Sequence, residues 1–407
     1  MVKLNNGARG QASVKTLYTM KKAALLLLCG GVVLCSCQKT IQNDTASKDA
    51  ALTGQEVSVS QIKTSFRKIF VLNEGGMGSN NASLDFLRSD GTYVTGAFKK
   101  MNPDVATGLG DVANDIAIKG SEVWMTVNNS GIVEVVSAED ETEIAAIPVP
   151  TPRNICFDDD YAYVSSWAGA FARGSYDEEG NYSITDSSNP KGQVYRINLK
   201  TKKAEASVEV GYQPEGMALA DGKLYVANSG GISSQLPPSY SYDNTVSVID
   251  TKSFKVVSCI EAVVNLKYVY ADKAGHVYVT TMGDYWNTHS GLYRLSERGA
   301  EKISDYVSVS CMAGNKIYFF GAENEFDWSA AKSYKGFCYN CTDDSTGEWN
   351  FASDATTPYS LLVFDEGTYM VGDAGDYFNP GSISLYAGGK KIWTTTSGVC
   401  PGHFAIW

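Results

Sequence analysis

The chain has 407 residues, of which 43% are apolar and 19% charged, so it can bury a large core and is neither disordered nor fibrous. Residues 1–36 contain five basic and no acidic residues, and the rest of the chain has 29 basic against 45 acidic residues. A surface this acidic argues against nucleic acid, and against docking flat on anionic lipid, because both partners require a basic footprint.

The N-terminal segment has the pattern of a targeting signal. Residues 20–37 are MKKAALLLLCGGVVLCSC, with two lysines followed by an apolar run, Ala23–Leu34, that is too short to span a bilayer. The last four of these residues resemble a bacterial lipobox, which implies that Cys37 becomes the acylated first residue of a mature lipoprotein. The alternative is an ordinary signal peptide cut nearby. Met20 is the expected true start, and acyl chains would anchor the protein without a transmembrane helix.

Residues 38–65 are polar and lack strong periodicity, which predicts a flexible tether between the lipid and the folded domain. The domain boundaries expected from the sequence are therefore 1–37 for the signal segment, 38–65 for the tether and 66–407 for one folded domain. No room remains for a second domain.

Residues 66–407 repeat one pattern of four short strands. The clearest copy spans residues 213–262, where apolar runs are separated by turns such as Ala220-Asp221-Gly222. The second strand of the pattern occurs seven times, at residues 68–76, 122–131, 161–169, 223–231, 276–284, 316–324 and 368–376. At about 49 residues per repeat, the pattern predicts an all-β fold, a seven-bladed β-propeller.

The two ends of this region predict how the ring closes. The first repeat begins at its second strand, Lys68–Leu72, and the chain ends on an isolated first strand, His403–Trp407. We therefore expect the C-terminal strand to complete the first blade. Closure of the ring would remove the exposed sheet edges.

The recognition face follows from strand direction. The end of each second strand and the start of each first strand meet on one face of the disc, and the long loops, rich in aromatic residues, also lie there. Aromatic rings with a few amides favour a flat or bulky, partly polar ligand. For any one aromatic the alternative is that it packs its loop onto the disc. The candidate ligand-binding residues are Asn73, Glu74, Asn114, Asn128, Arg153, Trp167, Glu215, Asn228, Tyr242, Tyr285, Trp286, Trp328, Tyr359, Tyr377, Phe378 and His403.

Motifs for catalysis, metals and cofactors are absent from the sequence, so we expect a non-enzymatic protein with no cofactor and no catalytic residue. Cys338 and Cys341 have CxxC spacing but no second pair, and three scattered histidines do not predict a metal site. Cys156, Cys259 and Cys311 lie within apolar runs, which predicts buried thiols. Channel carboxylates such as Glu74, Glu215 and Asp373 leave a glycan lyase or hydrolase as an alternative.

The opening KIFVLNEGGMGSNNASLDFL, the P-x-x-hydrophobic leaders and the LYVANSGG second strand resemble YncE-like seven-bladed propellers of Bacteroides-type lipoproteins. This resemblance covers residues 66–407. It implies a surface lipoprotein of the outer membrane that captures cobalamin, or a related corrinoid, and delivers it to a TonB-dependent transporter. Gln38-Lys39-Thr40, after Cys37, departs from the acidic export signal of this group, which leaves periplasmic display open. A protein- or glycan-binding adhesin or scaffold is the other alternative.

Overall fold

The computed structural model describes residues 52, 54–169, 173–176, 182–186, 189–235, 241–327 and 329–407. The predicted signal segment, the lipidation site Cys37 and the candidate Trp328 lie outside the described residues. No helix within the described ranges is long and apolar enough to cross a membrane.

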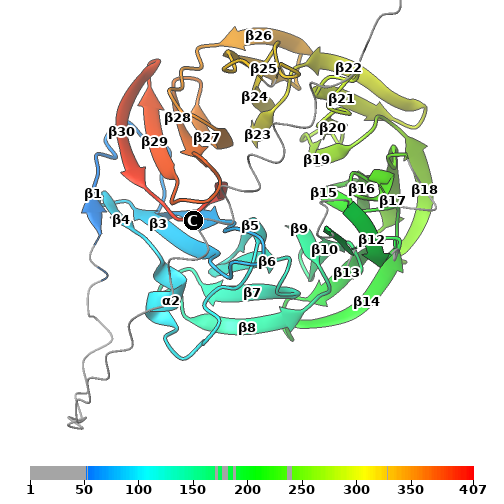
Figure 1. The fold of residues 1–407 in the computed structure, drawn as a ribbon, viewed down its shortest axis with the longest axis horizontal. Helices are drawn as coiled ribbons and strands as arrows, with labels where there is room; N and C mark the ends of the chain where they lie inside the picture. The colour runs from blue at the N-terminus through cyan, green and yellow to red at the C-terminus, as the bar shows by residue number, and fades with distance from the viewer. Residues whose placement is uncertain are drawn as a thin grey trace, which may run out of the picture. The chain divides into compact units, whose positions relative to one another are not determined.

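Seven antiparallel sheets surround a central axis, so the predicted seven-bladed β-propeller is confirmed (Figure 1). Blade one contains β31 (Pro401–Ile406), β2 (Lys68–Asn73), β3 (Ser83–Arg88), β4 (Thr92–Val94) and β1 (Gln55–Glu56). Blade two contains β5 (Ala113–Lys119), β6 (Glu122–Val127), β7 (Ile132–Ser137) and β8 (Glu143–Pro148). Blade three contains β9 (Pro152–Phe157), β10 (Tyr161–Ser166), β13 (Gln193–Asn198) and β14 (Lys203–Glu209), with the hairpin β11 (Arg173–Tyr176) and β12 (Tyr182–Asp186) inserted.

The remaining blades have the same order from the axis outward. Blade four contains β15 (Pro214–Ala220), β16 (Lys223–Asn228), β17 (Thr245–Asp250) and β18 (Lys255–Glu261). Blade five contains β19 (Leu266–Ala271), β20 (Val277–Thr281), β21 (Gly291–Ser296) and β22 (Gly299–Asp305). Blade six contains β23 (Val309–Ala313), β24 (Lys316–Ala322), β25 (Tyr334–Asn340) and β26 (Ser345–Trp349). Blade seven contains β27 (Pro358–Asp365), β28 (Thr368–Asp373), β29 (Ser382–Ala387) and β30 (Lys390–Thr396).

Burial follows the position of each strand within its blade. All six residues of β2 are buried, whereas six of the seven residues of β18 are exposed. The middle strands are apolar on both faces because each blade packs against a neighbour on either side. Phe70 and Phe86 of blade one, for example, share a cluster with Val123 and Met125 of blade two.

The C-terminal strand closes the ring as predicted. β31 pairs antiparallel with β2, with Ile406 opposite Ile69 and Phe404 opposite Val71. At the outer end of this pairing the Lys68 amide donates to the Trp407 carbonyl at 3.1 Å, and the Trp407 amide donates to the Lys68 carbonyl at 2.9 Å. The last strand therefore joins the two ends of the chain within one sheet.

Residues 55–65 depart from the predicted tether. β1 pairs with β4, Ile62 is buried, and Val57 and Val59 pack against an apolar cluster that blades one and seven share. The sequence hid this contact because one short strand with few apolar residues carries no periodicity. A second difference concerns helices. The described chain has the short helices α2 (Ala97–Met101) and η1 (Ser233–Gln235), which the expected all-β pattern did not include.

Candidate ligand-binding face

A repeated turn brings the start of each inner strand to one face of the disc. The residue directly before the inner strand adopts a left-handed backbone in five blades, at Val112, Thr151, Gln213, Asn265 and Cys400, and in blade six Tyr306 does so three residues before β23. Its carbonyl commonly accepts from the residue that follows the second strand, as between Trp167 and Thr151 at 3.2 Å and between Ser229 and Gln213 at 3.1 Å. Left-handed residues other than glycine are uncommon. The second and third residues after this turn point toward the axis in several blades, as Arg153 and Asn154 do in blade three and Lys267 and Tyr268 in blade five.

These side chains line an axial mouth cavity of about 130 Å³. The cavity brings together six of the predicted residues, Glu74, Asn114, Arg153, Glu215, Tyr359 and His403. It also contains Asn154, Lys267 and Tyr268, which the sequence analysis missed. Lys267 and Tyr268 follow the turn residues Asn265-Leu266 of blade five, just as Arg153 and Asn154 follow Thr151-Pro152 of blade three. The blade-five turn lacks the proline, so the repeat alignment did not reveal it. Aligning the repeats on the position of the turn would have found both residues.

Arg153 contacts three side chains, one each from blades two, three and four. Its Nε and Nη2 atoms each lie 3.0 Å from Glu215 Oε2, and its Nη1 donates to Asn114 Oδ1 at 2.6 Å. The guanidinium also lies 4.3 Å from the ring centre of Trp167. The charges of Arg153 and Glu215 therefore neutralise each other across blades three and four.

Glu74 is the centre of a second network, which crosses the closure of the ring. Tyr359 Oη donates to Glu74 Oε2 at 2.7 Å, and His403 Nε2 lies 3.2 Å from Oε1. Burial opposes ionisation of Glu74, but His403, Tyr359 and the charge of Lys267 outweigh it and lower the pKa of the carboxyl. Glu74 is thus an ionised carboxylate with both oxygens engaged.

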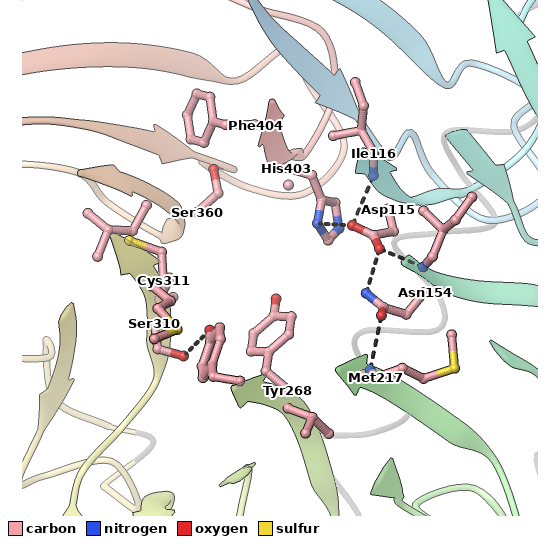
Figure 2. Close-up of a pocket in the computed structure, with 18 of the residues that line it drawn as sticks. Asp115, Ile116, Asn154, Met217, Tyr268, Ser310, Cys311, Ser360, His403 and Phe404 are labelled. Carbon is pink, nitrogen blue, oxygen red and sulfur yellow. Dashed lines mark hydrogen bonds and ion pairs between the residues drawn. The ribbon is translucent and has the colours of Figure 1, made fainter. Parts of the chain in front are cut away.

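A deeper cavity of about 390 Å³ continues along the axis below the mouth. Figure 2 shows His403, Asp115, Asn154 and Met217 along one side of this cavity, with Ser310, Cys311 and Ser360 across from them. On the side that contains His403, the polar groups contact one another in series. His403 Nδ1 lies 3.8 Å from Asp115 Oδ1, and the side-chain amide of Asn154 donates to Asp115 Oδ2 at 2.5 Å. The backbone amide of Met217 donates to Asn154 Oδ1 at 3.0 Å.

Asp115 also accepts from the backbone amides of Ile116 and Ile155, both at 2.9 Å. Burial nevertheless raises the pKa of Asp115 above its usual value, against the opposing effect of His403 and these amides. On this side of the deeper cavity, the polar groups therefore already bond to one another.

The rim beside the mouth is aromatic. A cavity of about 260 Å³ lies between blades five, six and seven and is lined by Tyr285, Phe326, Tyr334, Tyr359 and Tyr377, among other residues. Two loops here carry exposed rings: Tyr285 and Trp286 are 40% and 75% exposed, and Tyr377 and Phe378 are 48% and 85% exposed. Tyr242 of blade four lies close enough to Tyr285 for the two hydroxyls to interact electrostatically. Predicted aromatics of three blades thus gather on one side of the mouth.

The other predicted residues have structural contacts instead. Asn73, Asn128 and Asn228 are buried, and their amides donate to Ser83, to the Pro152 carbonyl, and to Thr245 and Ser247. Trp167 is only 7% exposed. These four side chains support the strand ends and the Arg153 network rather than the open surface.

Asp373, the third carboxylate considered for catalysis, holds a turn. It accepts from the amides of Thr356, Thr357 and Gly375 at 2.8 to 2.9 Å. It does not line the axial cavities.

No group of three or more His, Cys, Asp or Glu residues arranged to hold a metal ion occurs in the described part of the chain. All six cysteines after Cys37 are free. Cys156 and Cys311 are partly buried, but Cys259 is exposed, so the prediction of a buried thiol at Cys259 is wrong. Cys259 lies on β18, the outermost strand of blade four, which has no neighbouring strand to cover it.

Comparisons with known proteins identify the fold and no more. No family model matches the chain, and no curated protein matches it. A Kuenenia stuttgartiensis hydrazine synthase structure superposes with a TM-score of 0.52 and 13% identity, covering 72% of this chain and 89% of that one. A functionally unknown protein from Desulfotomaculum acetoxidans DSM 771 superposes with a TM-score of 0.55 and 12% identity, covering 84% of this chain and 98% of that one. At these identities the likeness defines a β-propeller, here seven-bladed, and leaves its ligand open.

Proposed function

We propose that this protein is a non-enzymatic, lipid-anchored capture protein of the outer membrane. It binds a bulky, partly polar ligand on the loop face of its propeller and delivers it to a TonB-dependent transporter. A corrinoid such as cobalamin is the proposed ligand. Display on the cell surface is part of the proposal.

One observation carries this proposal: exposed aromatic rings border a polar axial mouth. Trp286 and Phe378 are 75% and 85% exposed, so most of their apolar surface faces solvent. Aromatic surface of this kind marks binding sites more often than chance, particularly beside a concave polar site. The rings and the mouth residues, Glu74, Arg153, Lys267 and His403, are presented on the same face.

Corrinoids match this arrangement chemically. The corrin ring is wide and partly flat, which suits stacking on Tyr285, Trp286, Tyr377 and Phe378. Its fringe of amide side chains supplies donors and acceptors for a polar mouth. The sequence resemblance to cobalamin-capturing lipoproteins supports the same ligand.

The proposed lipid anchor and the proposed transporter partner are inferred from the sequence. The lipobox-like tetrapeptide that ends at Cys37 supports lipidation, and the resemblance supports partnership with a TonB-dependent transporter. The acidic mature chain is consistent with a domain that stands off from anionic lipid on its tether.

Calorimetric titration of residues 38–407 with cyanocobalamin tests the proposal. One-to-one binding that weakens in Trp286→Ala and Phe378→Ala, but not in the control Val257→Ala on the exposed outer strand β18, is the expected result. Absence of binding heat together with unquenched tryptophan emission would remove corrinoids. Turnover of a glycan panel that Glu215→Gln abolishes would instead establish an enzyme.

A further inference from the structure

Lys267 occupies the boundary between the axial mouth and the aromatic rim. It is the second residue of β19, and it lines both the 130 Å³ mouth cavity and the 260 Å³ rim cavity. Tyr359 is shared by the same two cavities. A ligand lying on the rim rings would therefore bring its edge to the Lys267 ammonium.

The carboxylates around this position are already satisfied. Glu74 accepts from Tyr359 and lies against His403, Glu215 is held by two nitrogens of Arg153, and Asp115 accepts from two backbone amides and Asn154. Each of these three acidic groups thus has at least two contacts with donor or cationic atoms of the protein, and for Glu215 both come from Arg153.

Lys267 differs from these groups. Among the described residues, no carboxylate oxygen lies within 4.0 Å of the Lys267 ammonium, the limit for an ion pair. The ammonium lies 5.0 Å from the ring centre of Tyr268. Burial disfavours the charged form, but Tyr268 and the more distant Glu74 and Glu215 outweigh it and raise the pKa of Lys267. The amine is therefore charged at neutral pH, and its hydrogen bond to Tyr268 uses one of three donors and leaves others for a ligand.

We propose that Lys267 binds a singly charged oxyanion, a carboxylate or a phosphodiester, on a ligand whose apolar body lies against the rim aromatics. This inference rests on the proposed ligand-binding function and names the chemistry that the ligand must carry. Glu74 and Glu215 lie near enough to act on the charge of Lys267, so they would repel a multiply charged group. In cobalamin the matching group is the phosphodiester of the nucleotide loop.

The first arm of the test compares two corrinoids. Cyanocobalamin carries the phosphodiester, whereas dicyanocobinamide lacks it. Lys267→Met should weaken cyanocobalamin binding about tenfold or more and leave dicyanocobinamide unchanged, because only the former loses a charge-assisted hydrogen bond. Lys267→Arg should restore most of the affinity. Lys255→Met, on the exposed strand β18, is the matched control, and melting curves verify that all variants fold.

The second arm does not depend on corrinoids. Naphthoate and neutral naphthamide share one aromatic body and differ in charge, so calorimetry with each isolates the oxyanion. Naphthoate should bind the wild-type protein more tightly than naphthamide, and Lys267→Met should remove the difference. Added salt should weaken naphthoate alone.

The two arms separate the possible failures. If neither corrinoid binds but naphthoate shows the Lys267-dependent preference, the corrinoid function fails and the oxyanion site stands with a carboxylate ligand. If cyanocobalamin depends on Lys267 while the naphthyl probes do not bind, the phosphodiester is the source. If Lys267→Met changes neither comparison, or no probe binds at all, the oxyanion site is overturned.

Discussion

The Tyr359 hydroxyl donates a 2.7 Å hydrogen bond to Glu74 Oε2, and so joins the last blade of the ring to the first. The two residues are 285 positions apart in the chain. Glu74 also lies 3.2 Å from His403 on the closing strand, so three segments that complete the ring meet at one carboxylate. The mouth and the closure of the ring are therefore built from the same side chains.

Tyr359→Phe should destabilise the protein by about 1–3 kcal/mol, since it removes one donor from a buried carboxylate. The loss should shrink at acid pH, because this hydrogen bond stabilises the ionised carboxylate and not the protonated acid. Glu74 has a lowered pKa when folded, so its contribution is present above the unfolded pKa of about 4.5 and is lost as the pH falls through the folded value. Urea unfolding at neutral pH and near pH 4 checks both effects. Equal unfolding free energies of variant and wild type at neutral pH would contradict the role given to this bond.

Deletion of Cys400–Trp407 should unfold or oligomerise the protein, because β2 would be left as a bare inner edge. Light scattering after size-exclusion chromatography and calorimetric melting measure this. Removal of residues 1–51, which precede the described sheet, is the control and should leave melting unchanged. A monomeric deletion variant with normal melting would mean that the ring closes in another way.

Glu134→Gln should stabilise the protein at neutral and alkaline pH. Glu134 on β7 is buried, its Oε1 has no hydrogen-bond partner among the described residues, and burial with nearby Glu143 raises its pKa to about 8. For a carboxyl with a raised pKa, stability is fully present below the unfolded pKa of about 4.5 and is lost as the pH rises through the folded value.

The wild-type unfolding free energy should therefore contain a term that falls between about pH 4.5 and pH 8, with a slope of up to about 1.4 kcal/mol per pH unit. The variant should lack this term. Denaturant melts across the range measure it, with exposed Glu301→Gln as control. Parallel pH profiles for wild type and Glu134→Gln would refute the assignment.

Lys68→Met should lower the free energy of unfolding by about 3–5 kcal/mol, because it leaves the buried carboxylate of Glu141 without its cationic partner. Lys68 Nζ lies 2.5 Å from Glu141 Oε1, and both side chains are almost fully buried between blades one and two. The double variant with Glu141→Gln should recover part of the loss, which a double-mutant cycle in urea would quantify. Additive losses in the cycle would show that the pair is not coupled.

Trp286→Ala and Trp167→Ala should have opposite consequences. Trp286 is mostly exposed, so its loss should weaken ligand binding by about 1–3 kcal/mol with unchanged melting. Trp167 is buried beneath Arg153, so its loss should cost about 3–5 kcal/mol of stability. Calorimetric titration and thermal melts on both proteins distinguish the roles. A stability loss in Trp286→Ala would place that ring in the packing of its loop.

The sequence by itself determined the fold and six of the residues that line the mouth. Seven copies of the second strand and the unpaired end strands specify a closed ring, since alternation and turns are local properties of the chain. Glu74, Asn114, Arg153, Glu215, Tyr359 and His403 followed from strand direction alone, and all six line one cavity.

Only the tertiary structure decided which polar groups form hydrogen bonds within the protein and which remain available to a ligand. Asn73, Asn128 and Asn228 look like mouth amides in the sequence, but residues of other strands and turns consume their hydrogen bonds. Lys267 was missed, and its importance arises from what the carboxylates of blades one, two and four already bind. Burial and partner choice depend on contacts between blades that are far apart in the chain, and local patterns do not encode them.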